Sequence, residues 1–510
     1  SKQARITLVS ETNALDSLRL NGDARVHATV DESGQFRSMS AANIRVFYDS
    51  GRSERIVLQG MANVELSGDG SGTGTRIFAE SIEVLTNDSG AAKRIDASTE
   101  VVANLGLANR GQSKAEQEIL ADSLRIVSRD DDYLTASFVG SVVYRESDEL
   151  IAAEGNDVRT ISAGRLEALL GSDFAGLSSA RFLFNVEFLN QALQALADEA
   201  IYEPVSGILS LSTNGEQTEK NPPRMVDGRG SLQAELLTIE LNGPSMVAVG
   251  SVESVLGGSR RGPTADAESS VENDPRRPGL LSSDGGIFVS SDRFEFDPET
   301  AVAVYTAEAP NTARLWQDNT EFRGMRIVLD ESSGNLNVEG TARTRTSMVQ
   351  TNDQTGVIEE TVSIGQGGSV IYDNSTKTAT YSTEAQLRGP HTDLKADTIE
   401  VLLKDDSKTL EQIVASSNVT LELETRFVSG SRLVYDDIEG KYEIQGQPVR
   451  IVEQTGEEAN SECRETTGRS LTFFISAADV SVDGESEIRT SSSSGGCELL
   501  FAPIILGSAR

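Results

Sequence analysis

Apolar and polar residues alternate along this chain in short runs that turn residues separate. In the stretch GSRLVYDDIEGKYEIQGQPVRIVEQ (430–454), one strand, an acidic turn, a second strand, another turn and a third strand follow one another. The residues that point one way are Leu433, Tyr435, Tyr442, Ile444, Val449 and Ile451. A period of two is typical of half-buried β-strands, and helical spacing is scarce. The best helical candidate, 188–204, also fits a strand pair, which we favour.

This phrase recurs as a unit along the chain. The unit is a small residue, an alternating strand, an acidic or glycine turn, a second strand, and a small residue before a third apolar pair. Examples begin at residues 41, 79, 121, 197, 291, 323, 368 and 396. One unit cannot bury its apolar face alone, so neighbouring units must stack into a continuous core. The sequence therefore predicts an all-β fold, an elongated stack of antiparallel hairpins in two tandem modules.

Two stretches break the alternation. Residues 257–286 are rich in Gly, Pro, Ser and charge, which predicts a flexible linker or a long surface loop. We therefore divide the chain into a module at 1–256, the linker at 257–286, a module at 287–489, and a tail at 490–510 that ends in an edge strand or in a docking strand for a partner. The polar stretch 212–230 is expected to be a long hairpin loop.

The inward-pointing strand residues are the main candidates for a binding surface. They are Ile44, Val46, Ile82, Val84, Leu124, Ile126, Ile327, Leu329, Ile399, Val401, Leu403, Val419, Leu421, Leu423, Leu433 and Tyr435. For any one of them an ordinary dry core is the simpler interpretation. Taken together, they would line an apolar trough if two facing sheets did not close fully. Aromatic residues make up only 5% of the chain, so the walls would be aliphatic and would suit alkyl chains.

Charge and composition exclude several classes of partner. The chain has 510 residues with 45 Lys and Arg against 79 Asp and Glu, a net charge of −34. That balance argues against a nucleic-acid partner and against docking on an anionic membrane surface. No run of 18 apolar residues is present. The chain begins SKQARITLVSETN without a signal peptide, as expected for a mature form or a fragment that lacks its targeting or anchor segment.

Catalytic chemistry finds little support. The recurring turn acids are Asp49, Asp88, Asp131, Asp330, Asp373, Asp406 and Asp437. Paired carboxylates serve acid–base catalysis, but Asp at hairpin tips more often bonds the local backbone. No nucleophile elbow, P-loop or zinc-helix signature occurs, and calcium binding at 129–132 lacks a ligand pattern. We expect no enzyme activity, no metal and no cofactor.

Two cysteines, Cys463 and Cys497, leave two interpretations open. They are either buried thiols or one disulfide that ties the tail to the last sheet. The second interpretation requires an oxidising compartment.

Residues 396–475 carry a family resemblance. The entry ADTIEV, the third strand ASSNVTL, the phrase GSRLVYD with YEIQGQPV, and the closing LTF resemble the OstA-like family of periplasmic lipopolysaccharide-transport proteins, of the LptA and LptC type. The family usually has G-N-V where this chain has Ser417-Asn418-Val419. Outside these residues the match rests on the repeated unit alone.

The resemblance implies a taco-shaped β-jellyroll whose groove carries acyl chains of lipopolysaccharide across the periplasm. It implies that subunits join end to end by strand pairing. The implied partners are an inner-membrane ABC transporter and an outer-membrane barrel assembly. A second possibility is a component held at the inner membrane by an anchor that this chain lacks. The matching groove or core positions are Ile399, Val401, Val419, Leu421, Leu433, Tyr435, Ile444, Val449 and Phe473. The chain is far longer than one such domain, which suggests a fused bridge. The alternative is a structural or adhesive β-scaffold with a closed core and no lipid cargo.

Overall fold

The computed structural model describes two compact units, Ser1–Gly250 (unit 1) and Ser251–Arg510 (unit 2). The structure describes residues 1–494 except 11–12, 28–35, 50–51, 67–73, 88–90, 111–112, 129–132, 149–157, 172–176, 191–192, 214–220, 244, 258–276, 282–284, 352–357, 424–425, 456–461, 475–479 and 483–488.

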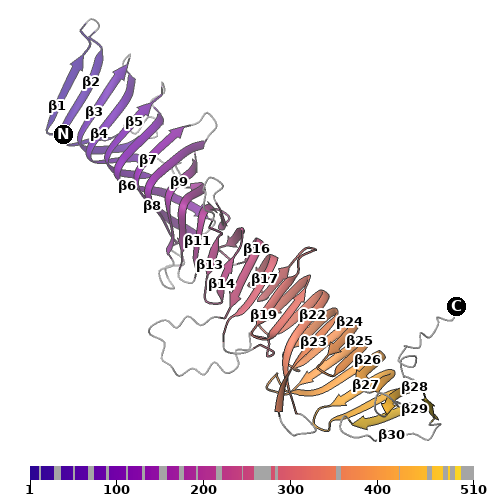
Figure 1. Cartoon of the computed structure of the whole chain (residues 1–510). Helices are drawn as coiled ribbons and strands as arrows, with labels where there is room; N and C mark the ends of the chain where they lie inside the picture. The colour runs from indigo at the N-terminus through magenta and orange to yellow at the C-terminus, as the bar shows by residue number, and fades with distance from the viewer. Residues whose placement is uncertain are drawn as a thin grey trace, which may run out of the picture. The chain divides into compact units, whose positions relative to one another are not determined.

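Unit 1 is built of strands that follow one another side by side (Figure 1). They are β1 (Gln3–Leu8), β2 (Leu15–His27), β3 (Phe36–Asp49), β4 (Arg52–Leu66), β5 (Arg76–Thr86), β6 (Ala92–Arg110), β7 (Ser113–Ser128), β8 (Tyr133–Asp148), β9 (Val158–Gly171), β10 (Leu177–Leu189), β11 (Gln194–Glu203), β12 (Ile208–Ser212), β13 (Arg224–Val226), β14 (Gly230–Gln233) and β15 (Leu236–Glu240). The division between the units falls within β16 (Met246–Leu256).

Unit 2 continues with the same kind of element (Figure 1). Its strands are β17 (Ile287–Asp297), β18 (Val302–Thr306), β19 (Ala313–Gln317), β20 (Thr320–Gly324), β21 (Arg326–Asp330), β22 (Asn335–Thr351), β23 (Ile358–Asp373), β24 (Thr378–Arg388), β25 (Thr392–Leu403), β26 (Leu410–Leu423), β27 (Arg426–Asp436), β28 (Lys441–Thr455), β29 (Glu462–Phe474), β30 (Val480–Val482) and β31 (Arg489–Ser494).

The predicted all-β fold of stacked antiparallel hairpins is confirmed. Every registered strand pair is antiparallel, and most strands pair with the next one along the chain. The described residues contain no helix. The stretch 188–204, which also fitted a helix, contains the end of β10 and the whole of β11. The period-two pattern distinguished strand from helix correctly, because each strand buries one face and exposes the other.

Each long strand turns a corner near its middle. In alternate strands two consecutive residues there have positive φ, such as Gly60 (78°) with Met61 (46°) in β4, and Ser417 (66°) with Asn418 (54°) in β26. The same pair is Gly22-Asp23, Thr99-Glu100, Gly140-Ser141 and Phe184-Asn185 in unit 1, and Gly340-Thr341 and Thr383-Glu384 in unit 2. The ladder register shifts at each of these points, as at a β-bulge.

The stacked corners form a crease in each unit. A buried Ala or Val follows every pair, namely Ala24, Ala62, Val101, Val142, Val186, Ala342, Ala385 and Val419. The crease divides the strands into two facing sheets. Wall A contains the halves that end in the turns after Asp49, Asp297, Asp330, Asp373 and Asp436, and wall B contains the other halves. The core of each unit lies between its two walls.

Short strands replace the long ones where β11 gives way to β12. β12 extends wall A by pairing with residues 199–203 of β11, while β13 extends wall B by pairing with Gln194–Leu196. The expectation of a plain hairpin loop at 212–230 was therefore wrong, because this stretch contains β13. Met225 explains the difference, because it lies between exposed Arg224 and half-buried Val226 and buries its own side chain.

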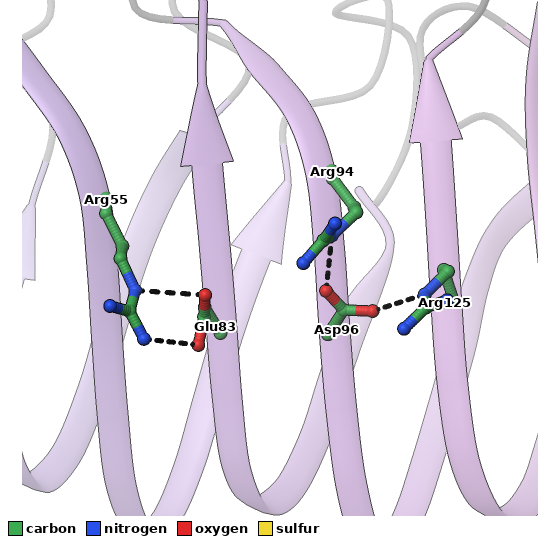
Figure 2. A network of polar contacts seen from close by, with 5 residues as sticks. All are labelled: Arg55, Glu83, Arg94, Asp96 and Arg125. Carbon is green, nitrogen blue, oxygen red and sulfur yellow. Dashed lines mark hydrogen bonds and ion pairs between the residues drawn. The ribbon is translucent and has the colours of Figure 1, made fainter.

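Ion pairs between neighbouring strands decorate the outer faces. Figure 2 shows that Arg55 on β4 makes a two-pronged contact with Glu83 on β5, with both N–O distances 2.9 Å. On the next strands Asp96 accepts from both Arg94 (2.5 Å) and Arg125 (2.6 Å). The arginines are exposed and the carboxylates half-buried, so each pair adds little stability, but together they offset like-charge repulsion on an acidic protein.

The crease generates the first prediction. Gly60→Ala places a Cβ in the left-handed region and 2.8 Å from the Cβ of Ala42, which has no flexible end to move away. We expect a loss of about 1–2 kcal/mol in the free energy of unfolding, measured by urea titration. Gly243→Ala, with no atom within 4 Å of its new Cβ, is the control and should leave stability unchanged. Equal effects from the two substitutions would show that the crease tolerates ordinary residues.

Candidate functional site

The inner face of wall A carries an unbroken row of apolar residues in each unit. In unit 1 one row of wall A runs strand by strand through Ala4, Leu20, Ile44, Leu58, Ile82, Ala97, Leu124, Phe138, Leu166, Phe182, Ala200, Leu211, Leu237 and Ala248. The matching row of unit 2 is Phe294, Tyr305, Ile327, Val338, Val370, Tyr381, Ile399, Ala415, Leu433, Ile444 and Leu471. Paired residues share a face, so each row is one continuous apolar strip.

Every groove or core residue that the sequence indicated lies on these inner faces. In wall A are Ile44, Val46, Ile82, Val84, Ile327, Leu329, Ile399, Val401, Leu403, Leu433, Tyr435, Ile444 and Phe473, and in wall B are Val419, Leu421, Leu423 and Val449. All are buried except Leu423, which is half-buried. Whether they contact a ligand is a separate question, which the proposal below addresses.

The interior is uncovered at the first strand. β1 contributes only to wall A, and its inner residues Ile6 and Leu8 are 62% and 51% exposed. The exposure falls along the same row, through half-buried Leu18 to Val46 at 8%. β1 is also an edge strand, since no other described strand pairs with its far side.

Farther along the chain, tyrosines cross the interior. In unit 1 Tyr202 on wall A donates to the Glu146 carboxylate on wall B (2.6 Å), and Tyr144 donates to the same oxygen (2.9 Å). In unit 2 the hydroxyl of Tyr305 lies 2.9 Å from that of Ser254, and the hydroxyl of Tyr381 lies 2.8 Å from that of Thr344. The expected trough is therefore not open at these positions, because polar side chains join the two walls.

Two inward tyrosines of unit 2, Tyr381 and Tyr372, have a raised pKa and are therefore neutral hydrogen-bonding groups. Burial raises the pKa of Tyr381 above its ordinary value, and the hydrogen bond with Thr344 only partly opposes this effect. Burial likewise raises the pKa of Tyr372.

Arginines close the mouth, the gap between the free edges of the walls opposite the crease. In unit 1 Arg159 at the edge of wall B donates to the carbonyl of Leu241 (3.2 Å) and to the side chain of Asn242 (3.0 Å) in a wall A turn. In unit 2 Arg426 of wall B donates to the carbonyl of Phe474 on wall A (3.1 Å).

Each of these arginines faces a glutamate on the adjacent strand of its own wall. Arg159 is directly opposite Glu146, and Arg426 is opposite Glu453, with Nε and Oε1 2.8 Å apart. No strand pair among the described residues joins the two edges, so arginine side chains connect the walls there without a backbone ladder.

Sequence reasoning missed these crossing residues. Glu146 continues the alternation of Val142 and Tyr144, so its inward direction is visible in the sequence. A charged residue in register with an apolar row is the signal that identifies such a contact.

The turn acids support hairpin tips instead of catalysis. Asp330 accepts hydrogen bonds from the hydroxyls of Ser332 and Ser333 and from their amides, and the hydroxyl bonds lower its pKa to about 2. Hydrogen bonds from Ser375 and Thr300 lower the pKa of Asp373 and Asp297 in the same way. In the turn after β27 the equivalent of Asp330 is Asp436, which accepts hydrogen bonds from the amides of Ile438 and Glu439 (3.0 Å each). The expected turn acid Asp437 is instead buried and accepts from the hydroxyl of Tyr435.

Other candidate chemistry has these outcomes. No group of three or more His, Cys, Asp or Glu residues able to hold a metal occurs among the residues that the structure describes, and 129–132, Asp88 and Asp131 lie outside them. Cys463 is disulfide-bonded, and Cys497 lies outside the described residues. In the described part of the chain no helix is long and apolar enough to cross a membrane.

A second prediction concerns the mouth of unit 2. Arg426→Met leaves Glu453, which is 7% exposed, as a buried charge without its ion-pair partner. We expect a loss of about 3 kcal/mol in the free energy of unfolding. Arg55→Met on the outer face is the matched control and should have no measurable effect. The double variant Arg426→Met/Glu453→Met should recover stability; if it stays as unstable as the single variant, the charge argument fails.

A third prediction follows from the low pKa of Asp330. Because the folded-state pKa lies near 2, below the ordinary 3.8, its stabilising effect is present above about pH 4 and disappears as the pH falls towards 2. Asp330→Ala should therefore lower the thermal midpoint at pH 6 and match the wild type near pH 2. Asp330→Asn keeps an acceptor oxygen without the charge and should lie between them. An equal deficit at both pH values would contradict the assignment.

Comparisons with known proteins are sparse. No family model matches the chain, and no curated protein matches it. Thirteen chains of solved structures match, among them LptH, the LptA-homologous periplasmic component of the conserved lipopolysaccharide transport device from Pseudomonas aeruginosa, whose match covers 28% of this chain and 85% of its own length. The identity is 16% and the TM-score is 0.21, so LptH says nothing about individual residues here.

Proposed function

We propose that this protein is a periplasmic lipid-binding bridge that shields the acyl chains of lipopolysaccharide, or of a related glycolipid, between the inner and the outer membrane. The observation that carries the proposal is the unbroken apolar row on the inner face of wall A in each unit. Every strand of these rows adds a residue, and no strand pair among the described residues joins the two walls at the mouth.

The physical need for such a protein is clear. Exposing an acyl chain of a dozen carbons to water costs about 10 kcal/mol, at about 0.8 kcal/mol for each CH₂ group. A lipid with several chains therefore crosses an aqueous gap only inside an apolar host. The inner rows offer aliphatic contacts of that kind, and the walls part at the mouth without breaking any ladder hydrogen bond.

The uncovered first strand suits the end-to-end joining that the sequence resemblance implies. A partner strand added to β1 would pair with its free edge and cover Ile6 and Leu8 at the same time. Partners of this kind are an inner-membrane ABC transporter complex and an outer-membrane barrel assembly. On this proposal the protein is a carrier and not an enzyme.

Crosslinking in cells that make lipopolysaccharide tests the function. A photoreactive residue in place of Leu421, an inner residue of wall B that is 1% exposed, should give lipid adducts on irradiation. The same residue in place of the neighbouring Glu422, which is exposed, should give none. If neither position yields adducts in folded protein, the alternative of a closed structural scaffold without cargo is correct.

A further inference from the structure

The loop between β16 and β17 carries a segment that is packed against unit 2. Residues Arg277–Leu281 are described, and both Pro278 and Leu281 are buried. Arg277 donates to the carbonyls of Gly257 and Gly285, near the ends of β16 and β17. The adjoining part of each of these strands belongs to wall B, so the arginine fixes the segment to that wall.

The same segment reaches wall A. The amide of Gly279 donates to the side-chain oxygen of Asn374, in the turn between β23 and β24 (3.1 Å). A Cβ added to Gly279 would lie 2.4 Å from the hydroxyl of Ser407 and 2.9 Å from that of Tyr372. Ser407 lies in the turn between β25 and β26, and Tyr372 points inward from wall A. The segment therefore spans the mouth of unit 2 from wall B to wall A.

This closure is weakly built compared with the strands around it. It makes no ladder with either wall among the described pairings, and the hydrogen bond that ties it to wall A comes from the Gly279 amide, beside the buried Pro278 and Leu281. Residues 257–276 connect the segment to β16, and the connection to β17, residues 282–286, reaches up to about 17 Å when extended, so the segment can leave without moving either strand.

We propose that Arg277–Leu281 is a removable strap over a lateral alkyl-chain site in unit 2. When the strap leaves, a single alkyl chain takes the place of Pro278 and Leu281 between the walls. The Asn374 carboxamide, released from Gly279, then faces the polar group at the head of that chain. A long alkyl chain buries more apolar surface than one proline and one leucine, which drives the exchange. The inference rests on the proposed function and names an entry site for it.

Gly279→Ala in the full chain tests the strap directly. The added methyl group collides with the hydroxyls of Ser407 and Tyr372, which destabilises the docked strap while every wall residue stays unchanged. We expect faster hydrogen–deuterium exchange of the amides of residues 277–281. We also expect about three- to tenfold tighter binding of the apolar fluorophore 1-N-phenylnaphthylamine, because the site is no longer occupied by the chain itself.

Gly389→Ala in the turn between β24 and β25 is the matched control. Its new Cβ meets nothing closer than 3.9 Å, so exchange and fluorophore binding should equal those of the wild type. Leu281→Ser is a second route to release, because it removes a buried anchor of the strap and leaves both walls intact. It should change both readouts in the same direction as Gly279→Ala.

The outcomes separate the strap from the general function. Faster exchange with unchanged fluorophore affinity would overturn the lateral site and leave lipid binding elsewhere in the interior intact. Binding to neither the wild type nor the variants would overturn the proposed function and the lateral site together. Unchanged exchange in both variants would show that the segment is a fixed part of the fold and would overturn the strap.

Discussion

The structure depends on the way each long strand turns its corner. A strand that crosses from one wall to the other must bend sharply and still keep its hydrogen bonds on both sides of the bend. Two successive residues in the left-handed region achieve this, and a small apolar residue directly after them fills the narrow space inside the bend. Because the corner is repeated in register, the strand halves on either side stay hydrogen-bonded to their antiparallel neighbours and form two facing walls.

The covalent connections fix where these walls are able to separate. They are joined through the crease by the backbone, whereas at the mouth only side chains and one loop segment meet. Tyr202, Arg159 and Arg426 make cross-wall hydrogen bonds, of which the first is buried, the second partly buried and the third exposed. Such contacts are individually modest, so the mouth is the part of each unit that opens at the lowest free-energy cost.

Much of this fold was predictable from the alternation alone. The strands, their antiparallel order and the inward direction of residues such as Ile399 and Leu433 follow from the period of two, because one face must be buried. The corners were not predicted, although Ser417-Asn418-Val419 was noticed as part of a repeated third strand. Their sequences range from Gly-Met to Thr-Glu and Phe-Asn, so the backbone conformation is conserved between repeats where the residue types are not. Register shifts of this kind are invisible to a pattern of apolar positions.

The candidate site was predicted in part for a related reason. The apolar inner residues are recognisable from the period-two alternation. The cross-wall contacts, however, join residues far apart in sequence, such as Glu146 with Tyr202 and Gly279 with Asn374. Nothing local marks such partners. The loop 257–286 has the composition of a free linker, and the short apolar phrase Pro278-Gly279-Leu280-Leu281 within it was the only sign that part of it packs.

The repeated crease also bears on how such a chain changes over evolutionary time. Each hairpin brings its own bend and its own share of both walls, and it meets only the hairpins before and after it. Duplication or deletion of one hairpin therefore adds or removes one slice without disturbing the remaining slices. The number of hairpins therefore sets the length of the stack, and selection for a particular length can act by changing that number.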